Sequence, residues 1–263
     1  MLRRIFLAMA ALAALCGHAA AQNAQQVVDL PTRAGVTQRL LVLEPAVPPK
    51  AVVLSFAGGH GGLQIGPSGS MAWGEGNFVV RTRALLAEQG LVVAVVDAPS
   101  DKQSPPYLAG NRQTPEHVAD IRAAIAWARQ TYRLPVWLLG TSRGTQSVAY
   151  LATELQGTDG PDGMVLTSSI ATDPKGRSVN AMALEKVRIP VLVLHHEQDG
   201  CKLCAFADAQ AIVPKLVNAP RTQFIGVRGG STRGDPCEAW AYHGYNGIEA
   251  EVVRQIGAWI VAP

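Results

Sequence analysis

The chain has 263 residues, of which 48% are hydrophobic and 16% are charged. This composition is typical of a folded globular protein and excludes a disordered, collagen-like or coiled-coil chain. The formal net charge of +3 is too small to indicate a nucleic acid or an anionic membrane surface as a partner.

The first 21 residues have the three parts of a secretory signal peptide. Arg3 and Arg4 form a positive start, an apolar run continues to Cys16, and Ala19–Ala21 form a small-residue cleavage site. We therefore predict that residues 1–21 are removed and that the mature protein is exported, to the periplasm or out of the cell, with no membrane anchor. Because the leader holds two of the 23 basic residues and no acid, the mature chain has 21 basic and 20 acidic residues, a net charge of +1.

Short apolar runs then alternate with longer segments of helical period, which is the pattern of a mostly parallel sheet with helices on both faces. About eight strands are expected, at residues 27–30, 39–43, 51–56, 91–97, 135–140, 163–168, 190–195 and 222–227. Helices are expected at residues 78–89, capped by Asn77, at 115–128, capped by Thr114, directly after Ser142, and at 248–260. No linker divides the sequence, so residues 22–263 are expected to form a single α/β domain.

Three segments are longer than simple connections. They span residues 57–76, 98–113 and 229–246, and each follows a predicted strand. All three therefore lie at the carboxyl edge of the sheet, where open α/β sheets bind their ligands.

The motif Gly140-Thr141-Ser142-Arg143-Gly144 follows a predicted strand and opens a predicted helix. A serine on such a sharp turn is lifted clear of the backbone, and glycines on both sides leave room for the turn. The helix N-terminus also favours negative charge that develops beside it. We therefore predict that Ser142 is a nucleophile; the alternative is a tight glycine turn whose serine only caps the helix.

A serine hydroxyl needs a base to take its proton and a carboxylate to orient that base. Asp199 follows the strand at 190–195, and His243 lies between the strand at 222–227 and the last helix. The chain order Ser, Asp, His, each after a later strand, places all three at one edge of the sheet. Ser142, Asp199 and His243 are therefore predicted to form a catalytic triad.

Other histidines and acids compete for these roles. His195 and His196 end a strand and are expected to be packed and hydrogen-bonded, while His117 is expected to face solvent. His60 precedes the nucleophile and fits a pocket wall better than the base role. Asp173 is the main alternative acid because it follows the strand after the nucleophile helix, and the others are Glu197, Asp208 and Asp235.

Acyl transfer develops a negative oxygen, which backbone N–H groups usually stabilise. One expected donor is the N–H of Arg143, directly after the nucleophile. The other comes from Gly58 or Gly59, in the glycine-rich loop after Phe56. No Lys-Ser or Lys-Thr pair follows that loop, so a phosphate-binding loop is disfavoured.

Together these motifs resemble the α/β-hydrolase superfamily. The resemblance rests on the turn at 140–144, the strand and acid turn Leu192–Asp199, His243-Gly244 and the loop Phe56–Gly62. Segments 77–81, 97–101 and 135–144 are more narrowly similar to exported bacterial hydrolases. The resemblance implies an α/β-hydrolase fold and a serine hydrolase that needs no cofactor and no metal.

The chain departs from the superfamily in two places. Ala57-Gly58 stands where a His-Gly pair commonly follows the strand, and residues 169–189 are too few for the cap domain that is often inserted there. We expect no large cap, only a short helix near 179–187. The pocket walls then come from the long loops, with candidates His60, Trp73, Tyr107, Trp240, Tyr242 and Tyr245.

Three cysteines remain after the leader, in a chain expected to reach an oxidising compartment. Cys201 lies two residues after Asp199 and Cys237 lies six before His243, so the acid and base loops run side by side if they share a site. We predict a Cys201–Cys237 disulfide. A Cys204–Cys237 bridge is the main alternative, followed by a Cys201–Cys204 bridge and by three free thiols.

The sequence thus predicts an exported serine hydrolase that cleaves a carboxylic ester, in a small molecule or a polymer, through an acyl-enzyme. Amide or thioester cleavage would use the same residues, and a binding protein without turnover is a further alternative. A thiol–disulfide enzyme built on Cys201 and Cys204 is disfavoured because that motif opens no helix after a first strand.

Overall fold

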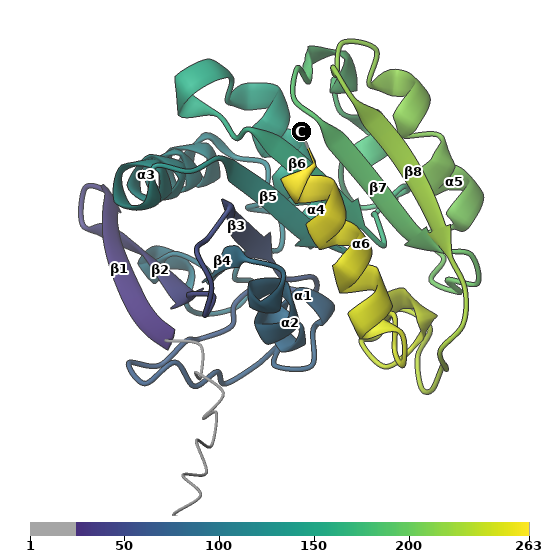
Figure 1. The fold of residues 1–263 in the computed structure, drawn as a ribbon, viewed down its shortest axis with the longest axis horizontal. Helices are drawn as coiled ribbons and strands as arrows, with labels where there is room; N and C mark the ends of the chain where they lie inside the picture. The colour runs from purple at the N-terminus through teal and green to yellow at the C-terminus, as the bar shows by residue number, and fades with distance from the viewer. Residues whose placement is uncertain (1–24, 263) are drawn as a thin grey trace, which may run out of the picture.

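The computed structural model describes residues 25–262, so the predicted signal peptide lies outside the described residues (Figure 1). Eight strands form one sheet in the order β1-β2-β4-β3-β5-β6-β7-β8. β2 is antiparallel to β1 and β4, and the other neighbouring pairs are parallel. This open, mostly parallel sheet confirms the predicted architecture. The strand bounds are β1 Gln25–Arg33, β2 Val36–Leu43, β3 Ala51–Phe56, β4 Leu91–Val96, β5 Val136–Thr141, β6 Gly163–Thr167, β7 Val191–His196 and β8 Thr222–Val227.

Helices cover both faces of the sheet and create two cores. Because successive strand residues point to opposite faces, Val52 and Leu54 of β3 pack in one core and Val53 in the other. The first core contains α3 and α4, and the second contains α1, α2 and α6, which crosses its face of the sheet in Figure 1. The helix bounds are α1 Phe78–Arg81, α2 Arg83–Glu88, α3 Pro115–Tyr132, α4 Gly144–Glu154, α5 Phe206–Gln210 and α6 Glu249–Val261.

The connection from β6 to β7 confirms that there is no large cap domain. The short helix predicted near 179–187 is instead two 3₁₀ turns, Val179–Ala181 and Leu184–Lys186. Met182 between them is extended, with φ −85° and ψ 161°, and this interrupts the helical path. The carboxyl edge of the sheet is therefore left to the long loops after β3, β4 and β8. Among residues 25–262, no helix is long and apolar enough to cross a membrane.

The helix predicted at 78–89 is divided at Thr82, whose hydroxyl donates to the Phe78 carbonyl at 2.6 Å. Asn77 occupies the N-cap position, but its side chain forms no capping hydrogen bond. The prediction for His117 was wrong: its side chain is buried and packs edge-on against Phe56, with 6.2 Å between ring centroids. The reason is helical periodicity, since His117 lies four residues before Ile121 and shares its sheet-facing side.

Candidate active site

Ser142 lies on a strained turn between β5 and α4. Its φ is 53°, in the left-handed region that side chains other than glycine rarely adopt. A Cβ atom at Gly144 would overlap the Phe56 carbonyl oxygen, and one at Gly140 would lie 2.7 Å from the Gly144 backbone. The Ser142 N–H donates to the Thr167 carbonyl at 3.0 Å, which ties the turn to β6. Within residues 25–262 the hydroxyl has no hydrogen-bond partner, and it lines a cavity.

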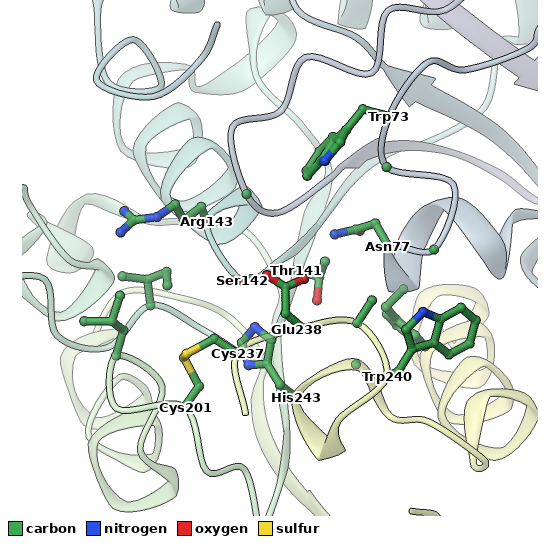
Figure 2. Close-up of a pocket in the computed structure, with 18 residues that line it drawn as sticks. Trp73, Asn77, Thr141, Ser142, Arg143, Cys201, Cys237, Glu238, Trp240 and His243 are labelled. Atoms are coloured by element: carbon green, nitrogen blue, oxygen red, sulfur yellow. A yellow bond between two sulfur atoms is a disulfide. The ribbon is translucent and has the colours of Figure 1, made fainter. Parts of the chain in front are cut away.

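His243 and Asp199 form a hydrogen-bonded pair beside this serine. The His243 Nδ1 atom lies 2.9 Å from Asp199 Oδ2. The other ring nitrogen, Nε2, is buried and forms no hydrogen bond with the described residues. Both His243 and Ser142 line the same cavity, and Figure 2 shows the imidazole ring next to the serine. The structure therefore brings the three predicted triad residues together.

The Asp199 carboxylate is completely buried and accepts further hydrogen bonds. The Cys201 N–H donates to Oδ1 at 2.9 Å, and His195 Nε2 lies 3.3 Å from Oδ2. Burial alone would raise the pKa of Asp199, but the hydrogen bonds of His195 and His243 outweigh it and lower the pKa to about 2. Asp199 is thus a permanent anion at neutral pH, which is what an orienting carboxylate must be.

Tyr245 holds the base loop against the sheet, a role that differs from its predicted place in a pocket wall. Its side chain is fully buried, and its hydroxyl donates to the Leu194 carbonyl and accepts from the Ser168 N–H. The Ser168 hydroxyl in turn donates to the His243 carbonyl at 2.7 Å. These bonds fix the backbone of the base directly over the ends of β6 and β7.

Three backbone N–H groups near Ser142 are available to a substrate oxygen. Within the part of the chain that the structure describes, the amides of Gly58, Gly59 and Arg143 donate no hydrogen bond. Gly58 lies against the nucleophile, since a Cβ atom there would be 2.9 Å from the Ser142 Cβ. Gly59 also lines the cavity. The predicted oxyanion donors are therefore adjacent to the predicted nucleophile.

The cavity beside Ser142 has a volume of about 390 Å³. Trp73 and Trp240 line it, as predicted, with exposed fractions of 38% and 41%. Ile170 and Leu203 add apolar surface, and the Arg143 side chain points away from Ser142 (Figure 2). Asn77, Thr141 and Glu238 add polar groups, so the walls combine apolar and aromatic surface with several polar side chains.

Three other predicted wall residues lie elsewhere. His60 is stacked between Trp73 and Tyr107, with ring centroids 3.8 and 4.4 Å away, so His60 and Tyr107 support the tryptophan from behind instead of lining the cavity. Tyr242 stacks on His196 at 4.4 Å. Stacking of aromatic rings on one another removed these side chains from the cavity surface.

The competing histidines and acids have other partners. His195 also contacts the Cys204 carbonyl, and His196 contacts the Gly229 carbonyl, so both are packed and hydrogen-bonded as predicted. Asp173 pairs with Arg143 at 3.0 Å and accepts from Gln146. The remaining candidates are engaged or exposed: Glu197 pairs with Arg228, Asp235 accepts from the Cys237 N–H, and Asp208 lies in the first turn of α5.

A disulfide joins Cys201 to Cys237, which confirms the predicted pairing. It links the acid loop to the base loop and forms part of the cavity wall in Figure 2. Cys204 is a free, buried thiol, and burial raises its pKa. Cys201, Cys204 and His243 offer atoms within 4.8 Å of one another, but the Cys201 sulfur is already bonded to carbon and sulfur and does not act as a thiolate ligand in this state.

Sequence reasoning missed two polar side chains near Ser142. Asn77 lines the cavity, and its Oδ1 is buried without a partner. Arg112 is buried behind the Gly58 and Gly59 loop and donates to its carbonyl groups. The only sequence signal for either was the unusual length of the loops at 57–76 and 98–113, which end at or next to these residues.

Comparison with known proteins supports the fold. No protein-family model and no curated protein sequence matches the chain. Among solved structures, an esterase from Pyrococcus furiosus has a TM-score of 0.63 at 11% identity and covers 90% of this chain and 91% of its own. Dienelactone hydrolase from Anabaena variabilis has a TM-score of 0.62 at 15% identity, covering 91% and 97%. A serine hydrolase without lid from Xanthomonas campestris has a TM-score of 0.57 at 18% identity, covering 92% and 96%. The chain thus has the α/β-hydrolase fold.

The disulfide is expected to contribute measurably to stability. Cys237→Ser should lower the free energy of unfolding, measured by urea denaturation, by up to about 4 kcal/mol, because the bridge closes a long loop in the unfolded chain. Cys204→Ser is the matched control and should keep the bridge. Peptide mapping of the unreduced mature protein should find Cys201 linked to Cys237, and free alkylation of all three cysteines would contradict the pairing.

Proposed function

We propose that this protein is an exported serine hydrolase that cleaves a carboxylic ester through a Ser142–His243–Asp199 triad and an acyl-enzyme. The observation that carries the proposal is the free Ser142 hydroxyl on a strained turn beside the hydrogen-bonded pair of His243 and Asp199. The esterase, the dienelactone hydrolase and the serine hydrolase that share this fold support a hydrolytic role.

In the first half of the proposed reaction, His243 Nε2 accepts the proton of the Ser142 hydroxyl while the oxygen attacks the ester carbonyl carbon. Asp199 keeps the proton of the imidazole on Nδ1 and stabilises the imidazolium that forms. The carbonyl oxygen becomes negative and accepts hydrogen bonds from the N–H of Arg143 and from Gly58 or Gly59. Each such donor typically contributes about 3 kcal/mol to stabilising the transition state.

Collapse of this intermediate breaks the bond to the alcohol oxygen, which takes its proton from His243 and leaves. Water then gives a proton to the neutral His243 and attacks the acyl-enzyme from the same side. The second tetrahedral intermediate releases the carboxylic acid and returns the proton to Ser142. In this scheme His243 accepts or donates the proton in every transfer.

The cavity favours an ester with an uncharged group of moderate size. With a volume of about 390 Å³, the cavity would remove such a group from water on the surface formed by Trp73, Trp240, Ile170 and Leu203. Amide or thioester cleavage would use the same residues, so a panel of esters of increasing acyl length, with matched amides and thioesters, distinguishes these substrates.

Export is the second part of the proposal. A disulfide beside the site supports an oxidising compartment, because cytosolic thiols are normally kept reduced. Detection of the mature protein beginning at Gln22 in a periplasmic or extracellular fraction tests this part directly.

Ser142→Ala is expected to lower kcat for short activated esters by at least about 10⁴-fold, because the attacking group is removed. Labelling by a fluorophosphonate should disappear, while the thermal midpoint should change little. His243→Ala should cost a similar factor, since triad members act as a unit. Full activity of Ser142→Ala would overturn the mechanism, and a folded wild type that neither reacts with the probe nor turns over any of the panel would be a binding protein.

Asp199→Asn and Asp173→Asn form a matched pair, because each removes one hydrogen-bonded carboxylate near Ser142. Asp199→Asn is expected to lower kcat by roughly 10⁴-fold, since an amide favours the wrong tautomer of His243. Asp173→Asn should stay within about threefold of wild type, because Asp173 contacts Arg143 and no histidine. Steady-state kinetics on one ester decides the ranking, and the reverse order would assign the acid to Asp173.

A further inference from the structure

A buried guanidinium without a carboxylate partner lies behind the loop of Gly58 and Gly59. The Arg112 side chain is almost completely buried, with an exposed fraction for the residue of 4%. Its Nη2 donates to the Ala57 carbonyl at 2.9 Å and to the Gly59 carbonyl at 3.2 Å, and its Nη1 donates to the Ser147 hydroxyl at 3.1 Å. Within residues 25–262 it forms no ion pair, and its Nε has no partner.

Such an arrangement is costly for the folded protein. An unpaired buried charge loses several kcal/mol of hydration, and buried arginines therefore normally pair with acids. Burial and the neighbouring Arg143 guanidinium lower the pKa of Arg112 to about 9, so the side chain still carries its charge at neutral pH. Burial, and after it the charge of Arg112, lowers the pKa values of the neighbouring His60 and His117.

The carbonyl groups that Arg112 binds determine where the loop amides point. In a trans peptide unit the C=O and the N–H point in opposite directions. The Ala57 carbonyl shares its peptide unit with the Gly58 N–H, so that N–H points away from Arg112. The Gly58 carbonyl, 3.5 Å from Nη2, has the same relation to the Gly59 N–H. Both amides donate no hydrogen bond within the described chain, and Gly58 lies against Ser142.

Glycine at position 61 leaves room for the Arg112 side chain. A Cβ atom at Gly61 would overlap the Arg112 Nη2 atom, and Gly61 has a φ of 73°. The guanidinium therefore occupies the space where the loop turns back, and only glycine at that position leaves the space open.

We propose that Arg112 is a positioning residue for the oxyanion site: it orients and polarises the peptide units of Gly58 and Gly59, and its positive charge is balanced only when negative charge develops on the substrate carbonyl oxygen. This inference rests on the proposed function. It explains why a cation is kept where a neutral donor would satisfy the same carbonyl groups at a lower cost of burial.

The test compares ligands of different charge in Arg112→Gln, which keeps a donor but removes the charge. An alkyl boronic acid forms a negative tetrahedral adduct with an activated serine, whereas an ether of the same shape stays neutral. For the preferred ester of wild type, kcat should fall by about 10²-fold or more with KM within about threefold, and boronate affinity should fall with kcat. Affinity for the ether, measured as a competitive inhibitor, should not change.

Arg112→Lys keeps the charge but not the two-carbonyl geometry, and its kcat and boronate affinity should lie between those of wild type and Arg112→Gln. The matched control is Arg129→Gln, since Arg129 also donates to loop carbonyls, those of Thr158 and Gly160, but away from the site. Its kcat and boronate affinity should equal those of wild type even if its thermal midpoint falls.

Wild-type kcat and boronate affinity in Arg112→Gln would overturn the inference, and so would an equal loss of boronate and ether affinity, which indicates a merely structural role. If Arg112→Gln does not fold, the same measurements on Arg112→Lys decide. A loss of at least about fivefold in kcat and in boronate affinity, with unchanged ether affinity, supports the inference. A smaller loss overturns it. A wild type without esterase activity or fluorophosphonate labelling would instead refute the proposed function.

Discussion

The close approach of helix α4 to the end of strand β3 determines the geometry of this site. A side chain at Gly144 would overlap the carbonyl of Phe56, so the first turn of the helix can lie there only with glycine at that position. This contact forces the sharp turn that holds Ser142 at a φ of 53°, and it brings Gly58 directly beside the serine. The Ser142 hydroxyl on the cavity wall and the adjacent free amides are therefore two consequences of one packing contact.

Two buried side chains of opposite charge, Asp199 and Arg112, lie on two sides of the site. Asp199 is a permanent anion that faces His243, the group that becomes a cation when it takes a proton. Arg112 carries a positive charge at neutral pH and lies behind the amides that we propose face the developing negative charge. The proposed transition state separates charge between the imidazole and the substrate oxygen, and each transient charge has a fixed opposite charge behind it. This arrangement lowers the cost of separating charge in a site of low dielectric constant.

Local patterns predicted the strands and the sharp turn at Ser142, because apolar runs and the spacing of glycines depend on neighbouring residues only. The proximity of Asp199 and His243 to Ser142 followed from a rule of topology, since the carboxyl ends of parallel strands meet at one edge of the sheet. They did not predict Arg112, whose carbonyl partners lie more than 50 residues earlier in the chain. His117 was misplaced because a polar residue in a first helical turn was assumed to face solvent, although its spacing from Ile121 puts it on the sheet side. Tyr245 was misplaced because its partner, the end of β7, is adjacent only after folding.

The two sides of the site are held by different means. The nucleophile and the oxyanion loop are fixed by backbone packing between β3, β5 and α4, which leaves no room for side chains at two positions. The acid and base lie on loops after β7 and β8. The base loop packs closely on itself, since a Cβ atom at Gly244 would overlap the Ala239 carbonyl oxygen and one at Gly230 would overlap that of Asn246. There the Cys201–Cys237 bridge joins the loops to each other, and the Tyr245 hydroxyl joins them to the sheet. Cross-links made by side chains thus attach the acid and base loops to each other and to the sheet, whereas the nucleophile turn is attached to β3 directly by backbone packing.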